Sequence, residues 1–187
     1  PLNEAVAVLD HVIANTGTLG IDPARIGMGG DSAGAGITVG TALSLKAAGR
    51  ADTLKFMLLI YGSYGLGYDC ESSVKYNAEI FGLSESRRRF YRTCYVANEA
   101  DHEDPRLKCL AADVSGLPPT FLGAAEMDPL CDNTPALSER LTAAGIANTV
   151  KIYPGVLHGF IHMTRSVTRA REALNDAGDA VRAALAG

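Results

Sequence analysis

The sequence predicts an α/β fold, with a mostly parallel sheet flanked by helices, in a single domain over residues 1–187. Three observations predict it. Short apolar runs of strand length alternate with stretches of helical periodicity along most of the chain. Residues 54–61 are almost entirely apolar, which is typical of a strand buried on both faces. Residues 30–34 are a glycine-rich turn between an apolar run and a helical stretch.

The first third of the chain is expected to hold a helix, a strand and a second helix. Four apolar residues recur at the spacing of one helix face: Leu2, Val6, Leu9 and Ile13. We expect this opening helix to end at Gly17 or Gly20. Residues 26–29 predict a short strand, and 33–48 predict a helix that ends at Gly49.

Residues 62–105 interrupt the alternation, and we expect a helical lid here that covers the carboxyl ends of the strands. Ser84 is expected to cap a helix. One face of that helix is expected to carry Phe90, Tyr91, Cys94 and Tyr95. The same helix has a basic cluster, which consists of Arg87, Arg88, Arg89 and Arg92. A charge run of this kind is usually a solvated helix face, and recognition of an acidic substrate is the alternative.

The alternation resumes in the last part of the chain. Strands are predicted at 119–125 and 149–153. Between them, Thr134 is expected to cap a helix that ends at Gly145. A closing helix is predicted by apolar residues on one face, namely Val167, Ala170, Leu174, Ala177, Val181 and Leu185.

The turn at 30–34 reads Gly-Asp-Ser-Ala-Gly, a G-x-S-x-G motif. Between a strand and a helix, this motif is typical of a nucleophile elbow, which exposes the serine hydroxyl on a sharp turn. Such a turn strains the backbone, so we expect Gly30 and Gly34 to be needed for their lack of a Cβ atom. The following helix would direct free N–H groups at the same place. The alternative is a simple glycine-rich turn with a capping serine, since the chain has 20 glycines.

A serine nucleophile needs a base to take its proton, and the base needs a carboxylate to orient it. Nucleophile-elbow enzymes carry these groups in the order Ser, Asp or Glu, His. Asp128 follows the strand predicted at 119–125, and His158 follows the next strand. Open α/β sheets place their sites at the carboxyl ends of strands. We therefore expect Ser32, Asp128 and His158 to form a catalytic triad.

Other acids and histidines are weaker candidates. Glu126 could serve as the acid, but strand alternation would point it away from the side of Asp128. His162 could serve as the base, but it lies further along, near the closing helix. His11 is expected in the first helix and His102 in a polar loop. An Asp before Pro is also common as a turn or helix-capping residue, which is the non-catalytic interpretation of Asp128.

Composition limits the classes of molecule that we expect this chain to bind. A net charge of −4 gives no reason to expect nucleic acid or an anionic membrane. No apolar run has the length of a membrane span, and no signal peptide is recognised. The four cysteines lack metal-site spacing and H-E-x-x-H is absent, so no metal or organic cofactor is expected. We interpret Cys70, Cys94, Cys109 and Cys131 as reduced thiols of a cytoplasmic protein, with a disulfide from Cys70 to Cys94 or Cys109 as the alternative.

Three segments together resemble the hormone-sensitive-lipase-like branch of the α/β-hydrolases. They are Gly-Asp-Ser-Ala-Gly at 30–34, Asp-Pro-Leu at 128–130 and Tyr-Pro-Gly-Val-Leu-His-Gly-Phe at 153–160. Within that branch, 61–65 and 124–130 resemble bacterial acetyl esterases. The resemblance covers essentially the whole chain, and the spacing of the three candidate residues suits it.

The resemblance implies an α/β-hydrolase fold and a serine carboxylesterase that acts on small, short-chain acyl esters without a cofactor. It implies that Ser32 is the nucleophile, His158 the base and Asp128 the acid that orients the base. The N–H of Ala33 would be one oxyanion donor. A non-catalytic ligand-binding module, or an amidase or thioesterase on the same scaffold, are the alternatives.

This chain departs from the branch before the elbow. Members of the branch carry a His-Gly-Gly-Gly oxyanion loop there, whereas this chain has none and only 31 residues precede Ser32. We therefore expect the C-terminal part of such a fold. Loss of an oxyanion donor typically lowers turnover about 10²–10³-fold, so we expect weak activity. We also expect an apolar, unpaired edge on the strand before Ser32, covered by a missing N-terminal segment or a second copy.

Overall fold

A computed structural model describes residues 1–186. Its centre is a four-stranded sheet in the order β1-β2-β3-β4, and each neighbouring pair is parallel. The strands are β1 (Gly27–Asp31), β2 (Phe56–Ile60), β3 (Thr120–Met127) and β4 (Asn148–Leu157). The predicted α/β class with a mostly parallel sheet is confirmed.

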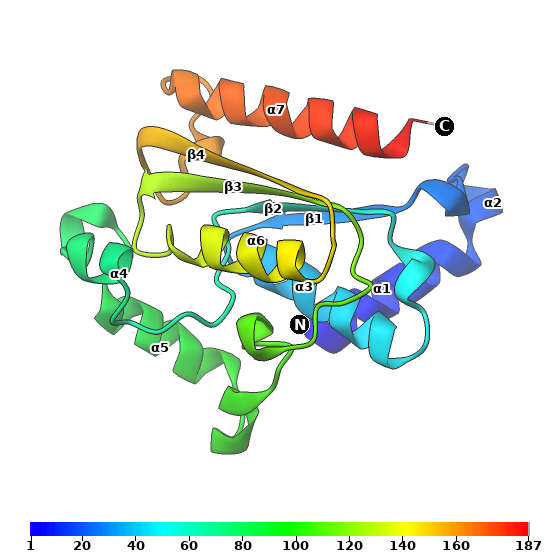
Figure 1. Ribbon diagram of the computed structural model, residues 1–187, viewed down its shortest axis with the longest axis horizontal. Coiled ribbons are helices and arrows are strands. Elements are labelled where there is room, and N and C mark those ends of the chain that lie inside the picture. The colour runs from blue at the N-terminus through cyan, green and yellow to red at the C-terminus, as the bar shows by residue number, and fades with distance from the viewer. Residues whose placement is uncertain (187) are drawn as a thin grey trace.

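Helices cover both faces of the sheet, as Figure 1 shows. On one face, α7 (Thr168–Leu185) lies across β2, β3 and β4. On the other face lie α3 (Ala33–Ala47) and α6 (Asn133–Ala143), and α1 (Leu2–Ala14) packs on α3. The sheet is therefore the middle layer of three, the arrangement that parallel strands require.

Two apolar clusters hold these layers together, and β2 contributes to both. Met57 and Leu59 belong to the cluster beneath α3 and α6. Phe56 and Ile60 belong to the cluster beneath α7. This alternation follows from the two-residue period of a strand. Burial of each such side chain contributes about 1.5–3 kcal/mol, so the apolar strand is the natural centre of the fold.

Two helix boundaries differ from the prediction. The opening helix ends at Ala14, and a short helix, α2 (Thr16–Leu19), follows before the left-handed Gly20. The helix predicted to start after Thr134 is preceded instead by Asp132, the N-cap residue of α6. Asp132 receives a hydrogen bond from the N–H of Ser72 at 2.8 Å, so a contact from a distant segment fixes this start.

The buried face of α7 also differs from the prediction at one position. Leu174 is 47% exposed, whereas Ala173 is almost fully buried. Ala170 and Ala177 are buried as predicted. Alanine side chains let the helix lie close to the sheet, and Leu174 falls beside the contact.

The two α-helices between β2 and β3 lie toward one end of the sheet, on the side opposite α7 (Figure 1). This segment contains α4 (Glu71–Lys75) and α5 (Glu85–Tyr95) with 3₁₀ turns around them. No residue of α5 is buried. The segment is therefore largely helical, and its role as a lid stays a prediction.

Helix α5 begins after Ser84 as predicted, but the capping contact is a different one. The Ser84 hydroxyl donates to Glu79 Oε1 at 2.5 Å instead of accepting from the helix. The first N–H of the helix, that of Glu85, donates to Asn77 Oδ1 at 2.6 Å. A side chain eight positions earlier therefore takes the capping role.

Strand β1 lies at one edge of the sheet and pairs only with β2 among residues 1–186. The expected unpaired edge is therefore present. The expectation that it is apolar is wrong, because Met28 is the only apolar side chain in a strand of sequence Gly-Met-Gly-Gly-Asp. What covers this edge stays a prediction.

All four cysteines are free thiols, so neither alternative disulfide forms in the structure. Within the described part of the chain, no helix combines the length and apolar character needed to cross a bilayer. The same residues contain no cluster of three or more His, Cys, Asp or Glu side chains arranged to hold a metal ion.

Candidate active site

The G-x-S-x-G turn joins β1 directly to α3. Ser32 has φ 54° and ψ −120°, a left-handed region that non-glycine residues rarely occupy. Its N–H donates to the carbonyl of Ile60 at 2.9 Å, which extends the pairing of β1 with β2 by one residue. Helix α3 begins at the next residue, Ala33. The backbone is therefore strained at the one serine that a nucleophile elbow requires.

The two glycines of the motif are not equivalent. A Cβ atom on Gly30 would lie 2.4 Å from the carbonyl carbon of Gly34, too close for any side chain. A Cβ atom on Gly34 would meet nothing within 4 Å. The expected need for Gly30 agrees with this geometry. The same expectation for Gly34 is wrong. Gly34 contributes backbone atoms that a Cβ atom on Gly30 would hit, but its own Cβ atom would have room.

Three side chains from separate strand ends form a hydrogen-bonded row. Asp128 Oδ2 lies 2.6 Å from His158 Nδ1. His158 Nε2 lies 2.8 Å from Ser32 Oγ. An ionised carboxylate only accepts hydrogen bonds, so Nδ1 carries the proton and Nε2 of the neutral ring accepts from the serine hydroxyl. The structure thus brings together the three residues that the sequence selected.

Burial and a backbone contact fix the acidic end of this row. Asp128 is fully buried, and its Oδ1 accepts from the N–H of Leu130 at 2.8 Å. The His158 side chain is only 16% exposed. A buried carboxylate with both oxygens bonded is held in one orientation, and it holds the imidazole ring in one tautomer.

The competing residues lie elsewhere or serve other contacts. Glu126 Oε2 accepts from the N–H of Gly155 and contacts no histidine. His102 accepts from Arg92 Nε at 2.8 Å. His11 is in α1, and His162 Nε2 lies 3.0 Å from Asp31 Oδ2.

Sequence reasoning missed Tyr61 and the role of Asp31. The Tyr61 ring lies 4.7 Å from the His158 ring, centroid to centroid. Its hydroxyl donates to Asp31 Oδ2 at 3.0 Å. Burial, reinforced by the charge of Asp31, raises the pKa of Tyr61 and keeps its hydroxyl protonated. Tyr61 directly follows β2, so the strand-end rule that selected Asp128 and His158 also applied to it.

Backbone N–H groups also face the serine. The N–H groups of Ala35 and Gly36 donate to the Ser32 carbonyl at 3.1 and 3.5 Å. The N–H groups of Ala33 and Gly34 precede the first hydrogen bonds of the helix, so they have no acceptor within the helix and can donate to another group. An anion that forms beside Ser32 would meet the positive end of α3.

A cavity of about 230 Å³ opens beside Ser32. Its walls come from the start of α3, the loop after β2 and the helix α5. The side chains that α5 contributes are spaced as one helix face: Arg88, Tyr91, Arg92 and Tyr95. Of the face that was predicted to carry four side chains, Tyr91 and Tyr95 line the cavity, whereas Phe90 and Cys94 do not. Of the basic cluster of α5, Arg88 and Arg92 line the cavity, whereas Arg87 and Arg89 do not.

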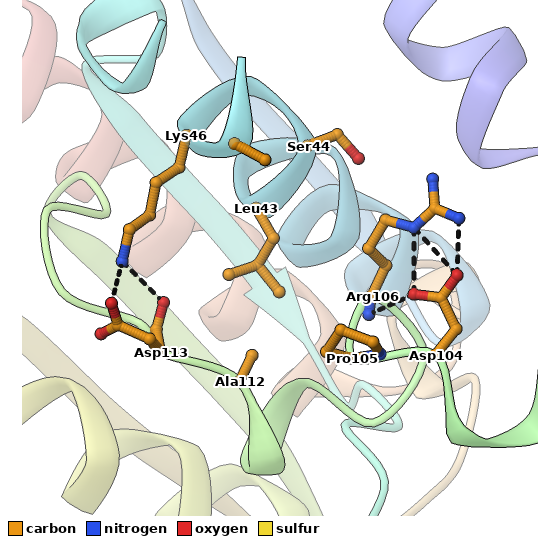
Figure 2. Close-up of a pocket in the computed structure, with 9 residues that line it drawn as sticks. Leu43, Ser44, Lys46, Asp104, Pro105, Arg106, Ala112 and Asp113 are labelled. Atoms are coloured by element: carbon orange, nitrogen blue, oxygen red, sulfur yellow. Dashed lines mark hydrogen bonds and ion pairs between the residues drawn. The ribbon is translucent and has the colours of Figure 1, made fainter. Parts of the chain in front are cut away.

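A second hollow, of about 520 Å³, lies along the later part of α3 (Figure 2). Lys46 donates to Asp113 Oδ2 at 2.6 Å, and Arg106 pairs with Asp104 at 2.5 Å. Ser44 is its only hydroxyl-bearing lining residue, and that hydroxyl donates to the carbonyl of Gly40 at 2.8 Å. No histidine lines this hollow, so its serine has no base.

Comparison with known proteins agrees with this architecture. The family described as alpha/beta hydrolase fold (Abhydrolase_3) matches residues 1–162. The chain belongs to this α/β-hydrolase family. The family membership accounts for the parallel sheet and for a serine on the turn after a strand.

Individual relatives are esterases. An acetyl esterase of Salmonella choleraesuis (strain SC-B67) is 34% identical over 177 residues, which cover 94% of this chain and 54% of the relative. A thermostable carboxylesterase cloned from a metagenomic library has a TM-score of 0.95 at 29% identity, covering 100% of this chain and 64% of the other. An esterase of Pyrobaculum calidifontis has a TM-score of 0.92 at 27% identity, with 99% and 61% covered. The chain thus spans about half the length of the curated relatives it matches.

Proposed function

We propose that this α/β-hydrolase chain carries the catalytic residues of a carboxylesterase that hydrolyses short-chain acyl esters. The observation that carries the proposal is the unbroken row of hydrogen bonds from Asp128 through His158 to Ser32. The strained backbone of Ser32 supports it, since such strain persists mainly where function requires it.

In the proposed reaction, Ser32 Oγ attacks the ester carbonyl carbon while His158 Nε2 takes the hydroxyl proton. The N–H of Ala33 stabilises the oxyanion of the tetrahedral intermediate. The bond to the alcohol oxygen then breaks, and His158 gives its proton to the leaving alcohol. Water attacks the resulting acyl-serine by the same steps, which release the acid and restore Ser32. Asp128 stabilises the imidazolium each time it forms.

A short acyl group is part of the proposal. It is supported by the similarity to proteins named acetyl esterases and by the modest volume of the cavity beside Ser32. Ala33 supplies one oxyanion donor, so we expect weak turnover from this chain by itself. We further propose that a preceding segment or a second copy covers β1, because an open parallel edge is a liability. A cytoplasmic location fits the four free thiols.

A fluorophosphonate probe and p-nitrophenyl acetate test the proposal. The probe should label Ser32, and Ser32→Ala should abolish both labelling and turnover. Ser44→Ala is the matched control, because Ser44 lies on the same helix but has no histidine beside it. Labelling or turnover that persists in Ser32→Ala would contradict the proposal. Faster turnover of a matched thioester or amide would assign the alternative hydrolase activities, and tight binding with no released alcohol would assign a binding module.

A further inference from the structure

One charged side chain in the wall of the cavity has no partner. Arg88 lines the cavity together with Ser32. Its Nε and Nη2 atoms are buried, and neither has a hydrogen-bond acceptor among residues 1–186. Buried polar groups are almost always bonded, so an orphaned guanidinium edge needs an explanation.

The other arginines nearby are satisfied. Arg92 donates to the ring and the carbonyl of His102 at 2.8 Å each. Arg106 pairs with Asp104. Glu85, the acid one turn before Arg88, is bonded by Arg89 at 2.6 Å. The two carboxylates whose charges act on Arg88, those of Glu85 and Asp128, are therefore both bonded to other groups.

The charge of Arg88 makes this arrangement costly. Burial lowers the pKa of Arg88, but a guanidinium stays protonated in proteins. The Tyr68 ring, 5.0 Å from the guanidinium carbon, gives some compensation through its π face. It supplies no acceptor for the two N–H groups, so an anion from outside the chain would remove the remaining cost.

We propose that Arg88 binds a carboxylate on the alcohol part of the ester substrate. Nε and Nη2 form one edge of the guanidinium, the fork that matches the two oxygens of a carboxylate. Because Arg88 already lines the cavity, a rotation of its side chain would bring this edge to a carboxylate bound there. The inference rests on the proposed esterase function. Because the acyl group is short in that proposal, the alcohol part has to carry the charge.

Two acetate esters that differ by one charge and one methyl group test the inference: 4-acetoxybenzoate, which is anionic, and its neutral methyl ester. The native chain should hydrolyse the anion with the higher kcat/KM. Arg88→Met should lower kcat/KM for the anion about 10–100-fold, the range of charged hydrogen bonds, and leave the neutral ester within about 2-fold. Arg88→Lys should recover part of the preference, since it keeps the charge and loses the fork.

Arg87→Met is the matched control. Arg87 is the preceding residue of α5, it does not line the cavity, and its Nη1 donates to the carbonyl of Gly82 at 3.0 Å. The variant changes net charge as Arg88→Met does, so it should keep the preference for the anion. An equal loss in both variants would assign the effect to long-range charge and overturn the inference.

The remaining outcomes separate this inference from the esterase proposal. No turnover of either ester would contradict the esterase function. Turnover of both esters without a preference, or equal losses for both in Arg88→Met, would overturn the role of Arg88 alone. If Arg88→Met fails to fold, benzoate and benzamide can be compared as inhibitors of methyl-ester hydrolysis by the native chain. Benzoate should bind at least about 10-fold more tightly, and equal binding would also overturn the inference.

Discussion

The two hollows beside α3 both have charged side chains in their walls. The charges are paired in one hollow, whereas one charge in the other lacks hydrogen-bond acceptors. In the hollow of Figure 2, Lys46 pairs with Asp113 and Arg106 pairs with Asp104. In the cavity beside Ser32, Arg88 keeps an edge without an acceptor. A hollow whose charges are paired is complete without a ligand. A cavity with a strained serine and a cation without acceptors is the one for which we propose a ligand.

The larger hollow is therefore the weaker candidate for function. Its volume of about 520 Å³ exceeds the 230 Å³ of the cavity beside Ser32. Volume measures available space, whereas chemistry needs a nucleophile, a base and an acceptor of developing charge in one place. Only the smaller of these two cavities lies beside such a set. The comparison teaches that unsatisfied groups and strain locate function better than size does.

The largest expected effect comes from removing the base of the smaller cavity. His158→Ala should lower kcat for a short-chain ester at least about 10³-fold, because no nearby group can take the Ser32 proton. Asp128→Asn should cost a similar factor by favouring the wrong tautomer of His158. Initial rates with p-nitrophenyl acetate measure both effects.

Lys46→Met in the other hollow is the control for these variants. It removes a charge at the far part of α3 and should change the same rates less than about 2-fold, in line with a surface substitution away from the site. If Lys46→Met were as damaging as His158→Ala, the distinction between the two hollows would fail.

The next effect concerns the turn that exposes Ser32. Gly30→Ala would force a Cβ atom to within 2.4 Å of the Gly34 backbone, so we expect a loss of about 1–3 kcal/mol in the free energy of unfolding. Gly34→Ala should cost less, because its Cβ atom would meet nothing within 4 Å. Urea unfolding followed by circular dichroism measures both. Equal losses would show that the turn needs both glycines for another reason.

The sequence located the site through one general rule. Ser32, Asp128 and His158 each follow a strand, and the carboxyl ends of parallel strands meet at one edge of the sheet. The order of residue types along the chain then limited the choice. Strands β2 and β3 could be predicted because their apolar runs are buried by neighbours on both faces, a property that the local sequence carries.

What the sequence could not supply depends on contacts between distant segments. The start of α6 is set by a bond from Ser72 to Asp132, sixty positions apart. The tilted contact between the Tyr61 and His158 rings, and the clash that a Cβ atom on Gly30 would make with the Gly34 backbone, are visible only in the folded structure. Helix α5 has no buried residue, so apolar spacing predicted only Tyr91 and Tyr95 of the four α5 side chains that line the cavity, and it missed Arg88 and Arg92.

The smallest expected effect tests whether the hollow of Figure 2 needs a ligand, since its charges are already paired. Hydrogen bonds from Lys46 and from Ser115 lower the pKa of Asp113. A lowered carboxyl pKa adds stability above the ordinary carboxyl pKa, and this stability is lost as the pH falls through the folded-state value. In Lys46→Met, the pKa of Asp113 should rise only part of the way toward the ordinary carboxyl value, because the hydrogen bonds from Ser115 remain, and NMR titration can measure this rise.

Because Asp113 is exposed, the matching change in thermal midpoint should be small at neutral pH and should shrink further in acid. The pair of Lys46 and Asp113 is then a structural contact. Its removal exposes the Asp113 carboxylate to water and creates no new binding site. If Lys46→Met instead gained affinity for cationic ligands such as Mg²⁺ or spermidine, the freed Asp113 would be part of a site that Lys46 occupies. The contrast between a hollow whose charges are paired within the chain and a cavity whose charge needs a ligand would then no longer hold.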